Sequence, residues 1–137
     1  MKKRVLFLCT GNSCRSQIAE GLLRHLAGNK YEVFSAGINP TVVNPHAIEV
    51  MKEIGIDISS YRSKSVDEFK NASFDFVITV CNNAKESCPY FAGSKMIHWN
   101  IEDPAVVKFS TDEKYNAFRT ARDKLLRKIH SELLQDI

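Results

Sequence analysis

The sequence has no apolar run long enough to cross a bilayer, no stretch rich in glycine, serine or proline, and no internal repeat. An apolar run at residues 5–9 follows the basic start of the chain, but it stops at Thr10-Gly11-Asn12, too early for a secretion signal. The net charge of +3 is spread out, without a basic run interleaved with aromatic residues. We therefore expect one cytoplasmic domain over residues 1–137, with neither a membrane nor a nucleic acid as its partner.

The sequence also lacks the cysteine pattern of a zinc site. Four residues separate Cys9 from Cys14 and six separate Cys81 from Cys88, so neither pair forms the usual tight knuckle. The four histidines are scattered without metal-ligand spacing. In a chain without an export signal, cysteines are more typical of reactive thiols than of structural disulfides. We expect no bound metal and no organic cofactor.

Apolar periodicity predicts alternating strands and helices. Runs rich in strand formers occur at residues 4–8, 31–35, 74–80 and 95–99, and helical spacing occurs at residues 16–26, 44–55 and 111–134. Leu26 and Ile54 are expected on the inward faces of their helices, and Thr111 is the expected cap of the last helix. This alternation predicts an α/β fold in which a parallel sheet is covered on both faces. Its ligand site should lie at the carboxyl ends of the strands, where Cys9 and Cys81 fall.

The loop CTGNSCRS, residues 9–16, lies between the first predicted strand and the first predicted helix. Backbone amides and the helix dipole converge there, which favours a bound tetrahedral oxyanion. Gly11 and Asn12 tolerate positive φ, which lets consecutive amides turn inward, and the planar guanidinium of Arg15 offers a fork for two oxygens. The loop lacks the lysine of a nucleotide-binding Gly-Lys-Ser/Thr loop. The expected oxyanion-binding residues are Thr10, Gly11, Asn12, Ser13, Cys14 and Arg15.

The same position favours the thiolate form of Cys9, which is a nucleophile at neutral pH. The hydroxyl of Ser16 is placed to donate a hydrogen bond to that thiolate. The alternative is that Cys9 is an unreactive buried cysteine at the end of a strand.

Residues 5–21, VLFLCTGNSCRSQIAEG, resemble the active-site segment shared by low-molecular-weight protein tyrosine phosphatases and thioredoxin-coupled arsenate reductases. The similarity continues through residues 35–37, 44–47 and 55–59, the strand ending at Cys81, and residues 98–105. The resemblance implies a four-stranded parallel sheet of the low-molecular-weight phosphatase (phosphatase-I) type and an oxyanion substrate. In the phosphatase branch the counterpart of Cys14 can form a protective disulfide with the nucleophile. Two interpretations of Cys14 therefore stay open here: the same protective role, or a small buried side chain that fills space.

Cys81 and Cys88 separate the two branches, because in position and spacing they resemble the reductases. Reducing As(V) to As(III) takes two electrons, which two thiols supply by becoming a disulfide, whereas ester hydrolysis needs no such pair. The resemblance implies an arsenate reductase in which Cys9, Cys81 and Cys88 form successive disulfides that thioredoxin reduces. Phosphate or sulfate would be competing oxyanions.

Three alternatives to the reductase interpretation stay open. Cys81 and Cys88 could be packing residues. The chain could be a low-molecular-weight phosphatase that hydrolyses phosphate monoesters, or a non-enzymatic module that binds oxyanions or senses redox state.

Asp103 is the expected general acid, because attack on arsenic expels an oxygen that needs a proton. The pair Asp103-Pro104 resembles the family's acid in type and relative position, although a solvated turn would have the same sequence. Ala105 stands where typical phosphatases of the family have an aromatic residue that lines the phosphotyrosine pocket. This difference favours a small inorganic substrate.

A further expectation concerns a cation behind the loop. Some thioredoxin-coupled arsenate reductases hold a potassium ion there, and the resemblance places Asn12, Glu20 and Ser35 at corresponding positions, together with an aspartate that aligns near Lys64. One hypothesis is that the Lys64 ammonium takes the place of the ion, pairs with Glu20 and holds Asn12 in its strained conformation. The alternative is an ordinary solvated lysine.

Overall fold

The computed structural model describes residues 2–81, 84, 86, 88–89, 91–106 and 110–134. Its sheet has the strand order β2-β1-β3-β4 and is built from β1 (Lys3–Cys9), β2 (Tyr31–Gly37), β3 (Phe76–Thr79) and β4 (Lys95–His98). Every neighbouring pair of strands is parallel, so the carboxyl ends of all four lie along one edge. The predicted α/β fold with a four-stranded parallel sheet is confirmed.

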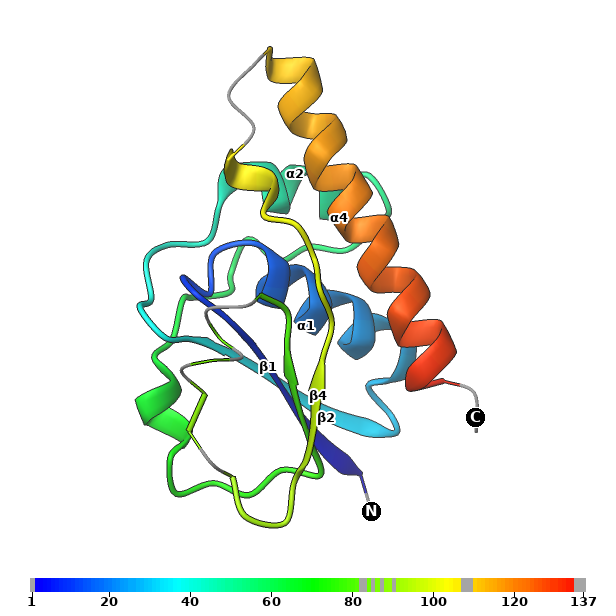
Figure 1. The fold of residues 1–137 in the computed structure, drawn as a ribbon. Helices are drawn as coiled ribbons and strands as arrows, with labels where there is room; N and C mark the ends of the chain where they lie inside the picture. Colours follow the sequence, from blue (N-terminus) through cyan, green and yellow to red (C-terminus); the bar gives the residue numbers. More distant parts are fainter. Residues whose placement is uncertain are drawn as a thin grey trace.

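The described helices are α1 (Arg15–Ala27), α2 (Pro45–Lys52) and α4 (Thr111–Glu132), with short 3-10 turns η1 (Val66–Phe69) and η2 (Pro104–Val106). Helix α1 packs on β1 and β2, and α4 packs against both α1 and α2. Figure 1 shows α4 running along one flank of the molecule past α1. Within the described ranges, none of the helices has the length and apolar character needed to span a membrane.

Both faces of the sheet are covered. The side chain of Ser35 reaches Glu20 of α1, so Phe34, the preceding residue of β2, points to the opposite face. There Phe34 packs edge-on against Phe69 and Phe74, with ring centroids 5.7 and 5.6 Å away. The central strand β1 is therefore buried between α1 and an aromatic cluster, as its continuous apolar run predicts.

Two helix starts follow from local sequence, one of them not at the predicted residue. Asn44 caps α2 by accepting a hydrogen bond from the His46 amide, and Pro45 is the first helical residue. The prediction that Thr111 caps α4 is wrong, because the Ser110 hydroxyl accepts from the Glu113 amide at 3.1 Å. The spacing of Ser110 and Glu113 is that of a capping box, which was the signal to follow.

Two residues that were expected to face the core are exposed. Leu26 and Ile54 each retain 40% of their accessible surface. In the last turn of α1 the buried residue is Ala27, so the apolar stripe has moved round the helix by one position, as a repeat of 3.6 residues allows. Ile54 lies beyond the end of α2 in a turn that closes at Gly55, which has φ +79°. β3 is also shorter than the predicted run at residues 74–80.

Candidate active site

The loop between β1 and α1 turns its carbonyl groups away from a common centre. Segment 38–44, which follows β2, donates backbone hydrogen bonds to the loop carbonyls of Cys9 (3.2 Å), Thr10 (2.8 Å), Gly11 (3.0 Å) and Ser13 (2.9 Å). In a trans peptide the N–H group points opposite to the preceding carbonyl. The N–H groups that follow these carbonyls therefore point inward and form a concave nest suited to an anion.

Asn12 is the strained residue of the loop, with φ +49° and no exposed surface. Of the two loop residues that tolerate positive φ, only Asn12 adopts it, because the described glycines with positive φ are Gly55 and Gly93. The side-chain nitrogen of Asn12, Nδ2, donates to Ser16 Oγ at 2.8 Å and to Ser35 Oγ at 3.0 Å. These bonds offset the cost of a left-handed conformation in a residue other than glycine.

Cys9 ends β1 inside this ring of hydrogen bonds, with 3% of its surface exposed. Its sulfur lies 2.8 Å from Ser16 Oγ. Since Asn12 Nδ2 can only donate, the Ser16 hydroxyl accepts from Asn12 and keeps its own hydrogen for the Cys9 sulfur. The hydrogen bond expected from the sequence is thus present, and its direction suits a thiolate.

Arg15 faces the same centre from the first turn of α1 and is 8% exposed. Its Nη1 donates to the Ile101 carbonyl at 3.0 Å, and its Nη2 lies 3.7 Å from Asp103 Oδ2. Its Nε is buried and has no hydrogen-bond partner among the described residues. A buried guanidinium whose Nε is free can donate to an oxygen of a tetrahedral anion.

Asp103 lies on the segment between β4 and η2. This segment is next to the loop of residues 9–16, which we call the anion loop. Its Oδ1 accepts from the Ala105 amide at 2.9 Å, which fixes the carboxylate in a turn. The Cys14 sulfur lies 3.8 Å from the same oxygen. Asp103 therefore meets Cys14 and Arg15 although it lies far from both in sequence, which places its carboxylate at the anion loop.

The Cys14 side chain is a protonated thiol at neutral pH. Burial, followed by the charges of Cys9 and Asp103, raises the pKa of Cys14 to about 12, with Arg15 opposing the change. At neutral pH its side chain therefore keeps its proton, which separates its chemistry from that of an activated nucleophile.

A pH-dependent loss of stability should follow from Cys14. Between pH 9 and pH 12 the unfolded chain releases the Cys14 proton while the folded protein retains it, so the free energy of unfolding falls as pH rises, by at most about 1.4 kcal/mol per unit. Below pH 9 this contribution is fully present. We expect Cys14→Ala to show a shallower decline than the unmodified protein in urea unfolding between pH 8.5 and about 10.5. Parallel declines would contradict the assignment.

Cys81 follows β3 at the same edge of the sheet. Its sulfur lies 3.3 Å from Thr10 Oγ1 and accepts from the Ala84 amide at 3.4 Å. Thr10 is the residue directly after Cys9, so the second thiol lies against the anion loop. All four thiols are free.

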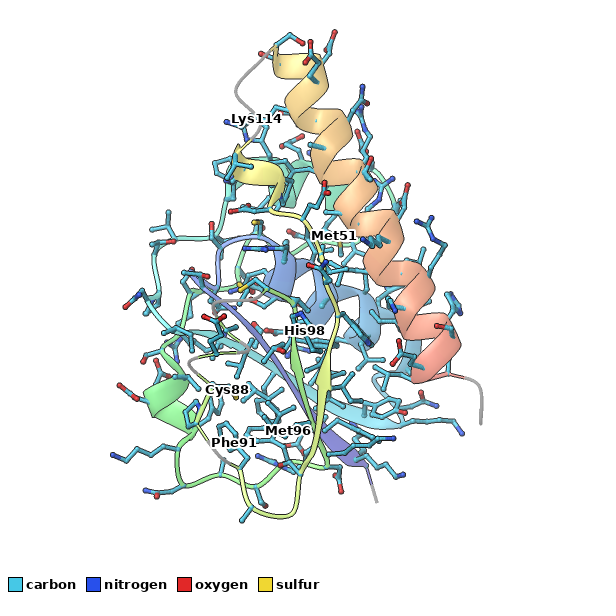
Figure 2. The ribbon with its side chains drawn as sticks, in the orientation of Figure 1. Met51, Cys88, Phe91, Met96, His98 and Lys114 are labelled. Carbon is cyan, nitrogen blue, oxygen red and sulfur yellow. The ribbon has the colours of Figure 1, made fainter. Side chains whose placement is uncertain are left out.

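The Cys88 side chain is half-buried, and its sulfur bonds to a neighbouring residue rather than to the anion loop. Its sulfur donates to the carbonyl of Pro89 at 3.2 Å, and burial raises the pKa of its thiol to about 11. In Figure 2, Cys88 and Phe91 are drawn on the η1 side of the molecule, away from α4. Of the segment 82–87, which joins Cys81 to Cys88, the structure describes only Ala84 and Glu86.

Behind the loop, a buried carboxylate and a lysine complete the network. Ser35 donates to Glu20 Oε1, and Lys64 Nζ lies 3.9 Å from the same oxygen. Lys64 Nζ also donates to the Arg62 carbonyl at 2.9 Å. Burial lowers the pKa of Lys64, and the charge of Glu20 opposes that change. Lys64 holds Asn12 through its backbone amide, which donates to Asn12 Oδ1 at 2.8 Å, rather than through its ammonium.

Sequence reasoning missed two residues that hold the loop. A side chain at Gly37 would place its Cβ 2.7 Å from both the backbone nitrogen of Asn12 and the carbonyl oxygen of Thr10, so the loop requires glycine there. Gln17 is fully buried and donates to Asn12 Oδ1 at 2.9 Å. Gly37 ends β2 two residues after Ser35, and a glycine at that position is a sequence signal for a close approach of another backbone. A glutamine on a helix gives no such signal.

Comparisons with known proteins agree with this geometry. The family model described as low molecular weight phosphotyrosine protein phosphatase matches residues 4–137. An arsenate reductase of Halalkalibacterium halodurans is 44% identical over 129 residues, which is 93% of each chain. A solved arsenate reductase in the phosphate binding state has a TM-score of 0.82 at 34% identity, covering 96% of this chain and 95% of that one. A thioredoxin-dependent arsenate reductase of Corynebacterium glutamicum has a TM-score of 0.69 at 32% identity, covering 95% of this chain and 63% of that one.

The matched residues include the complete loop, the strand before it and the helix after it, together with Asp103 and all four cysteines. The chain belongs to the low molecular weight phosphotyrosine protein phosphatase family.

Proposed function

We propose that this protein is an arsenate reductase that uses Cys9, Cys81 and Cys88 in turn and is regenerated by thioredoxin. The observation that carries the proposal is the position of Cys81, whose sulfur lies 3.3 Å from the residue that follows Cys9. A hydrolase has no use for a second thiol there, whereas a reductase needs one, because the two electrons that reduce As(V) to As(III) come from two thiols that become a disulfide. The names of the relatives support the same reaction.

In the first step the loop binds arsenate with its inward amides and with Arg15. The Cys9 thiolate attacks arsenic in line with the departing oxygen, so that a sulfur–arsenic bond forms as an arsenic–oxygen bond breaks. Asp103 donates the proton that lets the oxygen leave as water. The product is a covalent adduct of Cys9 with arsenic still in the As(V) state.

In the second step the Cys81 thiolate attacks the Cys9 sulfur. The sulfur–sulfur bond forms, the sulfur–arsenic bond breaks, and its electron pair remains on arsenic, which leaves as arsenite, As(III). Cys88 then attacks Cys81, which frees the Cys9 thiolate and moves the disulfide to Cys81 and Cys88. The dithiol of thioredoxin reduces that disulfide, a reaction that we place in the reducing cytoplasm.

A coupled assay tests the proposal. We expect arsenate, thioredoxin, thioredoxin reductase and its nicotinamide cofactor together to give steady oxidation of that cofactor, with inorganic phosphate and sulfate as competitive inhibitors. Omitting thioredoxin should stop turnover after the first arsenite per enzyme. No arsenite above the level without enzyme would reject the proposal.

The second candidate is hydrolysis of phosphate monoesters, which the family match and the shared loop favour. Cys9, Arg15 and Asp103 are sufficient for that reaction, because water can hydrolyse a phosphocysteine without any redox step. Ala105 offers no aromatic wall for a phosphotyrosine ring. We therefore expect activity toward p-nitrophenyl phosphate to be far below that toward arsenate.

Asp103→Asn should slow the first chemical step by about a hundred- to ten-thousandfold, because the amide cannot donate a proton to the leaving oxygen. Asparagine retains an acceptor for the Ala105 amide, so the turn is expected to survive. Single-turnover arsenite release measures the rate, and Glu102→Gln, the neighbouring exposed carboxylate, is the matched control. A normal rate in Asp103→Asn would move the role of the acid to another group.

The residues behind the loop fit an ammonium group better than a potassium ion. Lys64 Nζ already lies 3.9 Å from Glu20, where the resemblance places a cation, and its positive charge would repel a second one. Exchanging sodium for potassium at constant ionic strength should therefore leave melting temperature and activity unchanged. Lys64→Ala should lower both and make them respond to potassium, whereas Lys70→Ala, which removes an exposed lysine, should not. Strong potassium activation of the unmodified protein would rule this out.

A further inference from the structure

The anion loop is held by backbone donors at every carbonyl from Cys9 to Cys14 except that of Asn12. The carbonyls of residues 9, 10, 11 and 13 accept from segment 38–44, and that of Cys14 accepts from the Ile18 amide at 2.8 Å. No backbone N–H group of the described residues donates to the Asn12 carbonyl. Its orientation therefore depends on side chains.

Two side chains hold the Asn12 carbonyl. Gln17 Nε2 donates to it at 3.0 Å, and Ser63 Oγ donates to it at 2.7 Å. Gln17 is fully buried, and its Nε2 also faces Asn12 Oδ1 at 2.9 Å and the Arg62 carbonyl at 2.9 Å. Because all three of these oxygens are acceptors, only the amide nitrogen of Gln17 can occupy this position. The glutamine thus joins α1, the loop and the segment that carries Ser63.

The direction of this carbonyl fixes a donor on the other side of the peptide. The N–H group of Ser13 belongs to the same peptide unit as the Asn12 carbonyl and points the opposite way. While Gln17 and Ser63 keep the carbonyl outward, the Ser13 N–H points into the nest. If the unit turned over, a carbonyl oxygen would face the anion and one donor would be lost.

Asn12 is the one described residue other than glycine with positive φ, at +49°. Side-chain hydrogen bonds hold the orientation of the peptide that follows it, whereas backbone hydrogen bonds hold the neighbouring peptides. Removing one of these side-chain donors therefore weakens the hold on the Asn12–Ser13 peptide more than on any other peptide of the loop.

We infer that Gln17 and Ser63 are positioning residues of the anion site, which keep the Asn12–Ser13 peptide turned so that the Ser13 N–H binds the oxyanion. The inference rests on the oxyanion-binding part of the proposed function and not on its redox part. It assigns the two side chains a role in substrate affinity, although neither touches the anion.

Titration calorimetry of the reduced protein with inorganic phosphate tests the inference. Ser63→Ala removes one donor from a half-buried position, and Gln17→Met removes the other at similar length. Each variant should bind phosphate about tenfold more weakly, since one ordinary hydrogen bond changes an equilibrium by about that factor. Ser131→Ala, which removes a hydroxyl on α4 that bonds to Lys128, is the matched control and should bind normally.

Amide NMR separates a positioning role from a merely structural one. In the unmodified protein, phosphate should shift the amide signals of Gly11, Ser13 and Cys14. In Ser63→Ala the shift at Ser13 should be lost or strongly reduced, while those at Gly11 and Cys14 persist at saturating phosphate.

Unchanged affinity and an unchanged Ser13 shift in both variants would overturn the inference, as would equal loss of all three shifts with a lowered melting temperature. If the unmodified protein failed to bind phosphate, both the proposal that the loop binds oxyanions and this inference would be rejected. If phosphate binding behaved as expected but arsenate were not reduced, the redox proposal alone would fail.

Discussion

Cys9→Ser should abolish arsenate reduction while leaving oxyanion binding largely intact. A serine hydroxyl has a far higher pKa than a thiol, so it supplies no nucleophile at neutral pH, and it cannot form the disulfide that releases arsenite. The carbonyls of residues 9, 10, 11 and 13 are held by segment 38–44 and not by the Cys9 side chain, so the nest should survive the substitution. The coupled assay should read background, and calorimetry should give a phosphate affinity within a few fold of the unmodified value.

The two readouts of this variant fail independently. Retained reductase activity in Cys9→Ser would remove Cys9 from the mechanism. Loss of phosphate binding together with activity would instead mean that the substitution damages the loop, and Cys9→Ala would then be expected to damage it equally.

Cys88→Ser should reduce one arsenate per molecule and then stop as a Cys9–Cys81 disulfide. Cys81 lies against the loop, so the first disulfide does not need Cys88, whereas transfer of the oxidation away from Cys9 does. Mass spectrometry of a digest made without reductant would identify the trapped pair. Cys81→Ser is the informative comparison, because it should release no arsenite and accumulate the adduct on Cys9. Continued turnover of Cys88→Ser with thioredoxin would show that another group takes the oxidation outward.

The environment of Cys88 adds a conformational requirement to this step. Burial raises the pKa of its thiol to about 11, so at neutral pH it is a poor nucleophile where it lies, and its sulfur bonds to the carbonyl of Pro89. A disulfide also needs the two alpha carbons within about 7 Å of one another. We therefore expect the Cys81–Cys88 disulfide to form only after local rearrangement that exposes Cys88.

The residues whose roles depend on local chain geometry were predictable from the sequence. A strand, a short loop and a helix place Cys9 and Arg15 on one centre wherever the rest of the chain lies, and asparagine is among the few residues that accept positive φ. The spacing of Ser16 from Cys9 likewise predicts their hydrogen bond. The error at Thr111 is local as well, since the residue that caps the helix is the adjacent Ser110.

The residues that brace the loop from a distance were not predictable in this way. Gln17 is buried because segment 62–64 lies across it, and Gly37 is needed because the loop backbone lies 2.7 Å from where a side chain would begin. Neither fact is encoded within a few residues of the position. Helical periodicity assigns polar residues to solvent, so a buried glutamine that serves the backbone is read as a surface residue.

The most direct test of the redox mechanism is a count of thiols after a single turnover. The reduced protein, with its four free cysteines, is mixed with one equivalent of arsenate in the absence of thioredoxin, denatured in acid and titrated. Reduction through a cysteine relay predicts one arsenite and the loss of two thiols for each arsenate consumed, with the disulfide found by mass spectrometry at Cys9–Cys81 or Cys81–Cys88. Four titratable thiols per chain and no arsenite, after incubation long enough for complete turnover, would contradict it.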